Sequence, residues 1–291
     1  MRDKDPAVFN AENSQPKQGK LKSKTLTRAL DIIDVFDYDH RELTAQELSA
    51  RTGIPLSTLY RLIKDLETRG YLKYNSHLAT YGLGMRFFEL GCVVSQQIEL
   101  PEVCGPIMRA LNEQFNATVM LTAVYRNEVI CLEVIQSKNI LRLAMERGSR
   151  LPFYAGAGSK ILMAFLQQNQ LDHILEVQPI VAFTSHTLTN PAAFKEHLAE
   201  IRELGYALSD QEMNEGAVGV AAPVYNAQRE VVAGLTLAGP SSVLEHDNFP
   251  EFIQAVTQAA ADCSIRLGYH PPDGRPTPGG GRDRRKVLAL K

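Results

Sequence analysis

Five polar side chains between residues 57 and 64 have the types and spacing needed to contact a polyanion. They are Ser57, Thr58, Tyr60, Arg61 and Lys64. At helical spacing these side chains share one face, with Tyr60 at its margin. Short hydroxyl side chains let a helix approach a groove of duplex DNA closely, whereas Arg61 can reach a guanine or a phosphate and Lys64 a phosphate. The pattern therefore indicates a DNA-reading helix.

Three helices are expected to position this face, with bounds of about 25–36, 44–52 and 55–69. Thr44 followed three residues later by Glu47 predicts a capping box, in which each side chain hydrogen-bonds a free backbone N–H at the start of the second helix. Gly53 ends that helix and Gly70 ends the third, because glycine adopts the left-handed conformation at a helix C-terminus. Two helices joined by a short turn, the second polar at its start, are typical of a helix-turn-helix.

A β-hairpin is expected directly after Gly70, where apolar and aromatic residues alternate over 71–74 and 79–83. In this position a hairpin acts as the wing of a winged helix-turn-helix, and Lys73, Asn75 and His77 are placed for contacts with the DNA backbone. The alternative is a small three-helix unit with one ordinary polar face. The candidate DNA-binding residues are Thr44, Ser57, Thr58, Tyr60, Arg61, Lys64, Lys73, Asn75 and His77.

Length and charge fit a protein of two domains with a basic beginning. The chain has 291 residues and a net charge of −2, but residues 91–281 carry 12 Lys and Arg against 20 Asp and Glu. No apolar run is long enough to span a membrane and the N-terminus has no secretory pattern, so a cytoplasmic protein is expected. Residues 1–22 and 271–291 are predicted to be disordered tails, the second rich in Pro, Gly and Arg.

A second candidate site is the glycine-containing segment Ala155–Lys160, which leads into a predicted helix. Free N–H groups and the positive end of the helix dipole make such a position suitable for an anion, and small residues allow close approach. The GxxxxGK[ST] pattern of a nucleotide-binding loop is absent. The alternatives are a carboxylate site and an ordinary glycine-rich turn.

Several separated segments resemble the IclR family of bacterial transcription regulators, in the same order and spacing over about residues 22–268. The matching segments are Thr27–Ile33, Leu43–Leu48, Gly53–Leu62, Arg150–Lys160, Gly205–Tyr206, Asp210, Glu212, Gly216, Ala221–Val224 and Gly239–Pro240. The resemblance implies an α+β protein with three parts. These are a winged helix-turn-helix (23–84), a linker and dimerisation helix (85–100) and a GAF-like effector-binding domain (101–270). It also implies dimers that can assemble into tetramers.

The effector half is expected to bind a small organic acid. Its predicted elements are helices at 101–115, 158–169, 191–204 and 245–268, and strands at 117–125, 129–136, 140–146, 217–225 and 231–238. Family positions carried over to this chain give the candidate effector-binding residues Leu143, Met145, Ala157, Gly158, Ser209, Asp210, Gly219, Thr236 and Ala238. Gly219 and Ala238 stand where some members have polar side chains, so we expect a roomier, less polar pocket that accepts an aromatic acid.

One departure from the family concerns DNA. Many members carry Lys or Arg at the position of Leu56, and an apolar residue there favours a thymine methyl group or neighbouring protein over a phosphate.

Enzymatic function is not expected. The GxSxG and HExxH patterns are absent, and the four cysteines lie far apart with no CxxC pair. We therefore predict no catalytic residues, metal or cofactor. The prediction is a ligand-responsive regulator that binds a palindromic DNA operator, controls a catabolic operon and acts as a repressor or an activator. The alternatives are a small-molecule hydrolase and a protein-interaction module.

Overall fold

The computed structural model describes residues 23–37, 39–95, 99–139, 145–244 and 246–270. Within it the chain divides into two compact units, residues 1–98 and residues 99–291. Both predicted tails, 1–22 and 271–291, lie outside the described residues, as does Leu143. The two units are treated separately below.

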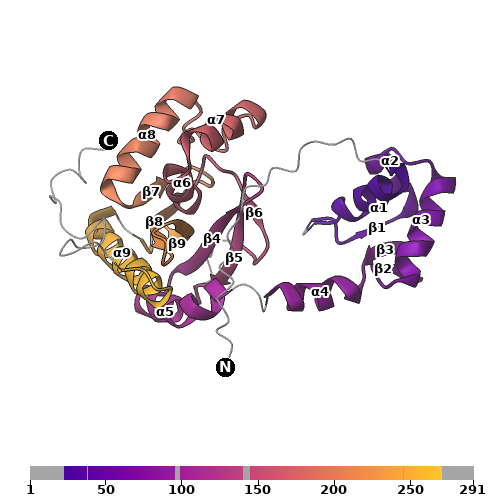
Figure 1. Ribbon diagram of the computed structural model, residues 1–291, viewed down its shortest axis with the longest axis horizontal. Helices are drawn as coiled ribbons and strands as arrows, with labels where there is room; N and C mark the ends of the chain where they lie inside the picture. Colours follow the sequence, from indigo (N-terminus) through magenta and orange to yellow (C-terminus); the bar gives the residue numbers. More distant parts are fainter. Residues whose placement is uncertain (1–22, 38, 96–98, 140–144, 245, 271–291) are drawn as a thin grey trace. The chain divides into compact units, whose positions relative to one another are not determined.

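The first unit contains the predicted helices and hairpin. The elements are α1 (Lys24–Asp34), β1 (Glu42–Leu43), α2 (Ala45–Thr52), α3 (Leu56–Thr68), β2 (Leu72–Asn75), β3 (Thr80–Leu83) and α4 (Met85–Ser95) (Figure 1). The strands form an antiparallel sheet of order β1-β3-β2. Ile32, Leu48, Leu59 and Ile63 pack into one buried core. This core orients α2 and α3, because the apolar stripe of each helix must face it.

Local signals set the limits of α2 and α3. Thr44 and Glu47 form the predicted capping box, and Gly53 ends α2 with φ 68°. Pro55 precedes the first residue of α3, where its missing N–H removes no helical hydrogen bond. The turn between the helices is further fixed by the Ser49 hydroxyl, which donates to the Ile54 carbonyl at 2.7 Å.

The second unit is a six-stranded antiparallel sheet covered by helices. Its elements are α5 (Glu99–Phe115), β4 (Thr118–Tyr125), β5 (Glu128–Ile135), β6 (Arg150–Leu151), α6 (Ala157–Ala164), α7 (Gln168–Val177), α8 (Pro191–Leu204), β7 (Ala207–Asp210), β8 (Ala217–Tyr225), β9 (Val231–Pro240), the 3-10 helix η1 (His246–Asn248) and α9 (Phe249–Arg266). The strand order is β6-β5-β4-β9-β8-β7. Helices α5 and α9 lie side by side against the sheet, and α6 packs against it beside α8 (Figure 1). This α+β architecture is the predicted one.

Several predicted bounds in the second unit were wrong. Residues 145–146, the described part of the strand expected at 140–146, are not in a strand, and the short β6 pairs with β5 instead. The helix expected at 158–169 ends at Ala164, where Arg202 of α8 donates to the Ala164 and Leu166 carbonyls at 2.5 and 3.3 Å. The final helix begins at Phe249. Strand β7 and helix α7 were not predicted.

Candidate functional site

The polar face of α3 is solvent-exposed in the structure. Ser57, Tyr60, Arg61 and Lys64 are exposed and Thr58 is half-buried, whereas Leu59, Leu62 and Ile63 on the other side are buried. Leu56, the first residue of the helix, is 39% exposed. The helix therefore presents the predicted hydroxyl and cationic side chains on an accessible surface.

Two of the predicted DNA-binding side chains, those of Thr44 and Asn75, already form hydrogen bonds within the chain. The Thr44 hydroxyl donates to Glu47 Oε2 at 2.8 Å and accepts from the Glu47 N–H at 3.3 Å. The Asn75 amide lies 3.3 Å from Glu42 Oε2 and its oxygen accepts from the His77 N–H at 3.2 Å. These contacts hold the start of α2 and the tip of the hairpin. Lys73 and His77 are exposed at the hairpin.

Glu42 ties the hairpin to the rest of the first unit. Its carboxylate accepts hydrogen bonds from Thr80 Oγ1 at 2.8 Å and from Asn75. These bonds, with the nearby Lys73 ammonium, lower the pKa of Glu42. Tyr74 packs on Tyr81 with ring centroids 4.9 Å apart. Tyr74 and Tyr81 therefore stiffen the wing by packing against each other across the hairpin.

The register of the second sheet brings four of the predicted effector residues together. Ser209 of β7 pairs with Gly219 of β8, and Gly219 pairs with Ala238 of β9. Directly paired residues of antiparallel strands point to the same face. Thr236 and Met120 are paired in the next row on that face. The floor of the cavity is thus set by strand pairing.

A cavity of about 90 Å³ lies between this floor and the start of α6. It is lined by Met120, Thr122, Met145, Leu151, Gly156, Ala157, Gly158, Ser209, Met213, Asn214, Ala217, Val218, Gly219, Thr236 and Ala238. Gly156, the N-cap residue of α6, has no side chain to cap the helix, and the N–H groups of the first turn have no partners within the helix. A helix start of this kind favours a negatively charged group.

Gly158 permits the close approach of α6 to the sheet. A Cβ atom at this position would lie 2.7 Å from Thr236 Oγ1 and 3.2 Å from Thr122 Oγ1. Thr122 Oγ1 donates to the Gly158 carbonyl at 3.2 Å. Thr236 is 1% exposed, and its hydroxyl has no hydrogen-bond partner among the described residues. A buried hydroxyl at a cavity wall is a candidate ligand contact, because such groups are normally paired.

The comparisons with known proteins identify the family. A model of the IclR helix-turn-helix domain matches residues 25–76, and a model of the bacterial transcriptional regulator IclR C-terminal domain matches residues 92–265. This chain belongs to the IclR family. It is a DNA-binding transcriptional regulator rather than an enzyme.

Individual IclR-family relatives agree with the assignment. The transcriptional regulator XynR of Escherichia coli K12 is 33% identical over 84% of this chain and 98% of its own length. The transcriptional repressor IclR of the same strain is 29% identical, over 92% and 96%. Among solved structures, an IclR transcriptional regulator from Silicibacter sp. TM1040 superposes with a TM-score of 0.75 at 25% identity, over 87% of this chain and 100% of that one.

A further IclR homolog, from Microbacterium hydrocarbonoxydans, was crystallised with 4-hydroxybenzoate. It shares the fold with a TM-score of 0.75 at 24% identity, over 84% of this chain and 98% of that one.

Most of the effector residues expected from the IclR-family resemblance line the cavity. Seven of the nine do so: Met145, Ala157, Gly158, Ser209, Gly219, Thr236 and Ala238. Asp210 is not among the lining residues. Thr122, Met213 and Asn214 line the cavity but were not predicted. Thr122 was missed because it reaches the site only through the pairing of β4 with β9. No local sequence pattern showed that pairing.

A buried ion pair adjoins the cavity of this IclR-family chain. Lys160 is 2% exposed, and its ammonium donates to the Glu212 carboxylate, to the Leu208 carbonyl at 2.6 Å and to His197 Nε2 at 3.1 Å. An ammonium has three donors, so all of them are used. Glu212 Oε2 also accepts from the Gly156 N–H at 3.0 Å. Burial lowers the pKa of Lys160, and the Glu212 charge opposes that shift.

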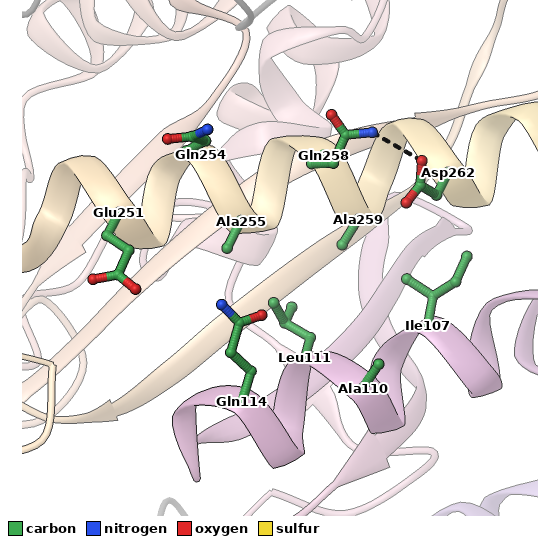
Figure 2. Close-up of a pocket in the computed structure, with 10 residues that line it drawn as sticks. All are labelled: Ile107, Ala110, Leu111, Gln114, Glu251, Gln254, Ala255, Gln258, Ala259 and Asp262. Carbon is green, nitrogen blue, oxygen red and sulfur yellow. Dashed lines mark hydrogen bonds between the residues drawn. The ribbon is translucent and has the colours of Figure 1, made fainter.

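A larger hollow of about 470 Å³ lies between α5 and α9 (Figure 2). Figure 2 shows Ile107, Ala110 and Leu111 of α5 facing Ala255 and Ala259 of α9 across it. Gln258 donates to Asp262 at 2.9 Å along α9. None of the predicted site residues lines this hollow, so the smaller cavity at α6 is the candidate effector site.

Two further searches covered the described residues. Among them, no cluster of three or more His, Cys, Asp or Glu side chains is arranged to hold a metal ion. No helix in the described ranges is long and apolar enough to cross a membrane.

Proposed function

We propose that this IclR-family chain binds a palindromic operator as a dimer, in the cytoplasm, and that a small organic acid in the α6 cavity controls that binding. The exposed face of α3 is the observation that supports DNA reading, because it presents Ser57, Arg61 and Lys64 beside a stiffened wing. Two such helices in a dimer enter successive major grooves about one helical turn apart. We further propose that the operator controls a catabolic operon.

The start of α6, where the N–H groups of the first turn have no helical partners, carries the effector proposal. It faces a largely apolar cavity that also contains the Thr236 hydroxyl, so a carboxylate can bind at the helix while its carbon skeleton packs against apolar side chains. A cavity of about 150 Å³ accepts benzene in another protein, and this one is smaller. Met120, Met145 and Met213 line it, and flexible methionine side chains repack readily around ligands. We therefore propose that an aromatic acid also fits; the Microbacterium homolog was crystallised with such an acid, 4-hydroxybenzoate.

The linker helix α4 is the proposed dimer contact. Met85, Phe88, Val93 and Val94 are 69%, 68%, 56% and 49% exposed. Exposed apolar side chains gathered on one helix in this way are usually covered by another protein surface. We propose that a second copy covers it and that two dimers can join through their effector domains. The proposed boundaries remain 23–84 for the DNA-binding domain, 85–100 for the linker and 101–270 for the effector domain.

One set of titrations tests both halves of the proposal. The protein is mixed with fluorescent fragments of its own upstream region at low ionic strength, and binding is followed by anisotropy with and without acetate, benzoate or 4-hydroxybenzoate. We expect specific binding that weakens steeply with salt and changes when an acid is added. Failure to bind any fragment would refute the DNA-binding proposal. Direct binding of each acid is measured by calorimetry. Binding of acetate but of neither benzoate nor 4-hydroxybenzoate would refute the aromatic-acid proposal.

A further inference from the structure

The anion-favouring end of α6 already holds a carboxylate that belongs to the chain itself. Glu212 Oε2 accepts from the N–H of Gly156, the N-cap residue of α6. Gly156 lines the cavity, and so does Met213, the residue after Glu212. A Cβ atom on Gly156 would lie 3.0 Å from Met213 Sδ. The Glu212 charge is therefore fixed beside the cavity wall, next to the position proposed for the ligand carboxylate.

The buried ammonium of Lys160 neutralises the charge of the Glu212 carboxylate. Lys160 lies one helical turn after Gly156 on α6, and its ammonium pairs with Glu212 behind the cavity wall. Side-chain exposures of 2% and 13% leave the pair little screening by water. The remaining Lys160 donors reach the Leu208 carbonyl of β7 and the His197 ring of α8. The pair therefore has a fixed position as well as a balanced charge.

Backbone contacts hold Glu212 in place from the other side. Its carbonyl accepts from Thr187 Oγ1 at 2.7 Å, and the Gln211 carbonyl accepts from Thr184 Oγ1 at 2.7 Å. The Glu212 backbone is therefore fixed by the 184–187 segment, while its carboxylate is held by Gly156 and Lys160 at α6.

We propose that the Lys160–Glu212 pair sets the electrostatic potential of the effector pocket, and so determines how strongly it prefers a carboxylate over a neutral ligand of the same shape. With the pair intact, only the α6 dipole attracts the ligand carboxylate. Without Lys160, the Glu212 carboxylate repels it. Without the Glu212 charge, the Lys160 ammonium attracts it more strongly. This inference rests on the proposed function of the cavity as an acid-binding pocket.

Matched acid and amide probes isolate the charge effect. Dissociation constants are measured by calorimetry at neutral pH for acetate and acetamide and for 4-hydroxybenzoate and 4-hydroxybenzamide, with the full chain. The variants are Lys160→Met, Glu212→Gln and the double variant Lys160→Met/Glu212→Gln. For Lys160→Met we expect the acid to weaken about tenfold relative to its amide, as for a buried charge several ångströms away. Glu212→Gln should shift this ratio in the opposite direction.

The double variant is the control for folding, because it leaves no unpaired buried charge. In the double variant, the affinity for the acid divided by the affinity for its amide should return close to the wild-type value. If Lys160→Met does not fold, Glu212→Gln is compared with the double variant instead. The affinity for the acid relative to its amide must then be lower in the double variant than in Glu212→Gln. Ratios that stay unchanged, or that shift in the same direction in both single variants, overturn the inference alone. A wild-type chain that binds none of the acids overturns the proposed function, and this inference with it.

Discussion

Thr44 and Glu47 bind each other's backbone at the start of α2. The Thr44 N–H donates to Glu47 Oε2 at 2.7 Å, and the Glu47 N–H donates to Thr44 Oγ1 at 3.3 Å. The Thr44 hydroxyl also donates to the same carboxylate at 2.8 Å. These bonds lower the pKa of Glu47. Thr44 was proposed as a DNA contact, but in this structure its side chain first serves to start the helix that supports α3.

Replacing Thr44 tests that structural role. Thr44→Ala should lower the free energy of unfolding by about 1 kcal/mol, because the N-cap hydrogen bond is lost. Thr44→Ser should restore most of it, since serine caps equally well. Urea denaturation measures both. A Thr44→Ala chain of unchanged stability with weakened DNA binding would instead assign Thr44 to the DNA.

Arg61 and Lys64 are a matched pair on the exposed face of α3. If Arg61 reads a base, Arg61→Ala weakens binding to the operator by about 1–3 kcal/mol and relaxes its sequence preference. Lys64→Ala should weaken all sequences about equally and reduce the salt dependence, as expected for a phosphate contact. Lys64 lies 3.7 Å from Glu67 in a largely exposed pair, which contributes little to stability. Anisotropy titrations against operator and scrambled duplexes separate the two effects.

A footprint that is the same for wild type and Arg61→Ala would remove Arg61 from the DNA site. Gln46→Ala is a control for surface substitution, because Gln46 is exposed on α2 and is not a predicted contact. It should leave both duplexes bound as before.

The first unit was predictable because its signals are local. The capping pair Thr44 and Glu47, the left-handed Gly53 and the alternation in the hairpin each act within a few residues. Asn75 shows the limit of such signals. Its partner Glu42 is distant in sequence and meets it only after β1 pairs with β3. The sequence therefore placed the polar residue Asn75 near a turn, but could not show that its amide is hydrogen-bonded to Glu42.

The effector pocket depended on long-range pairing, so the residues alone defined it less well. Motif positions placed Gly158 and Ser209, yet Thr122 belongs to the site only because β4 joins β9 and faces α6. Strand β7 was missed because it is short and at the sheet edge, where its pairing with β8 decides its conformation. Lys160 was recognised as part of a loop, but its burial follows from three acceptors on separate elements.

Two glycines in the pocket should respond differently to an added methyl group. At Gly219 a Cβ would meet Ala238 Cβ at 3.4 Å, an ordinary contact, so Gly219→Ala should fold and reduce the cavity. We expect it to weaken 4-hydroxybenzoate more than acetate in calorimetric titrations. Gly158→Ala would place a Cβ 2.7 Å from Thr236 Oγ1, and overpacking of this kind costs about 1–3 kcal/mol. Equal weakening of both acids by Gly219→Ala would show that ligand size is not read at this wall.

His197 should make the stability of the effector unit depend on pH. Burial and the nearby Lys160 ammonium lower its pKa, while Glu200 opposes the shift. The unfolded chain therefore binds the proton more readily, and stability should fall as pH drops below the ordinary histidine pKa of about 6.5. His197→Gln keeps an acceptor for Lys160 and should remove this part of the pH dependence. Urea denaturation across this range compares the two chains. Carboxylates with lowered pKa values, such as Asp172, affect both chains alike at lower pH.

Cys92 offers a direct test of dimerisation through α4. It is exposed on α4 one turn after Phe88, whereas Cys104, Cys131 and Cys263 are buried and all four are free thiols. Burial raises the pKa of Cys131 to about 12. The hydrogen bond with Cys104, together with burial, raises the pKa of Cys263. Both thiols therefore react slowly while the chain is folded. If a second copy covers α4, the reaction of Cys92 with a thiol reagent should slow as protein concentration rises. Phe88→Glu, which places a charge on the same face, should abolish that dependence and keep Cys92 reactive throughout. A Cys92 rate that is fast and independent of concentration in the wild type would place the dimer contact elsewhere.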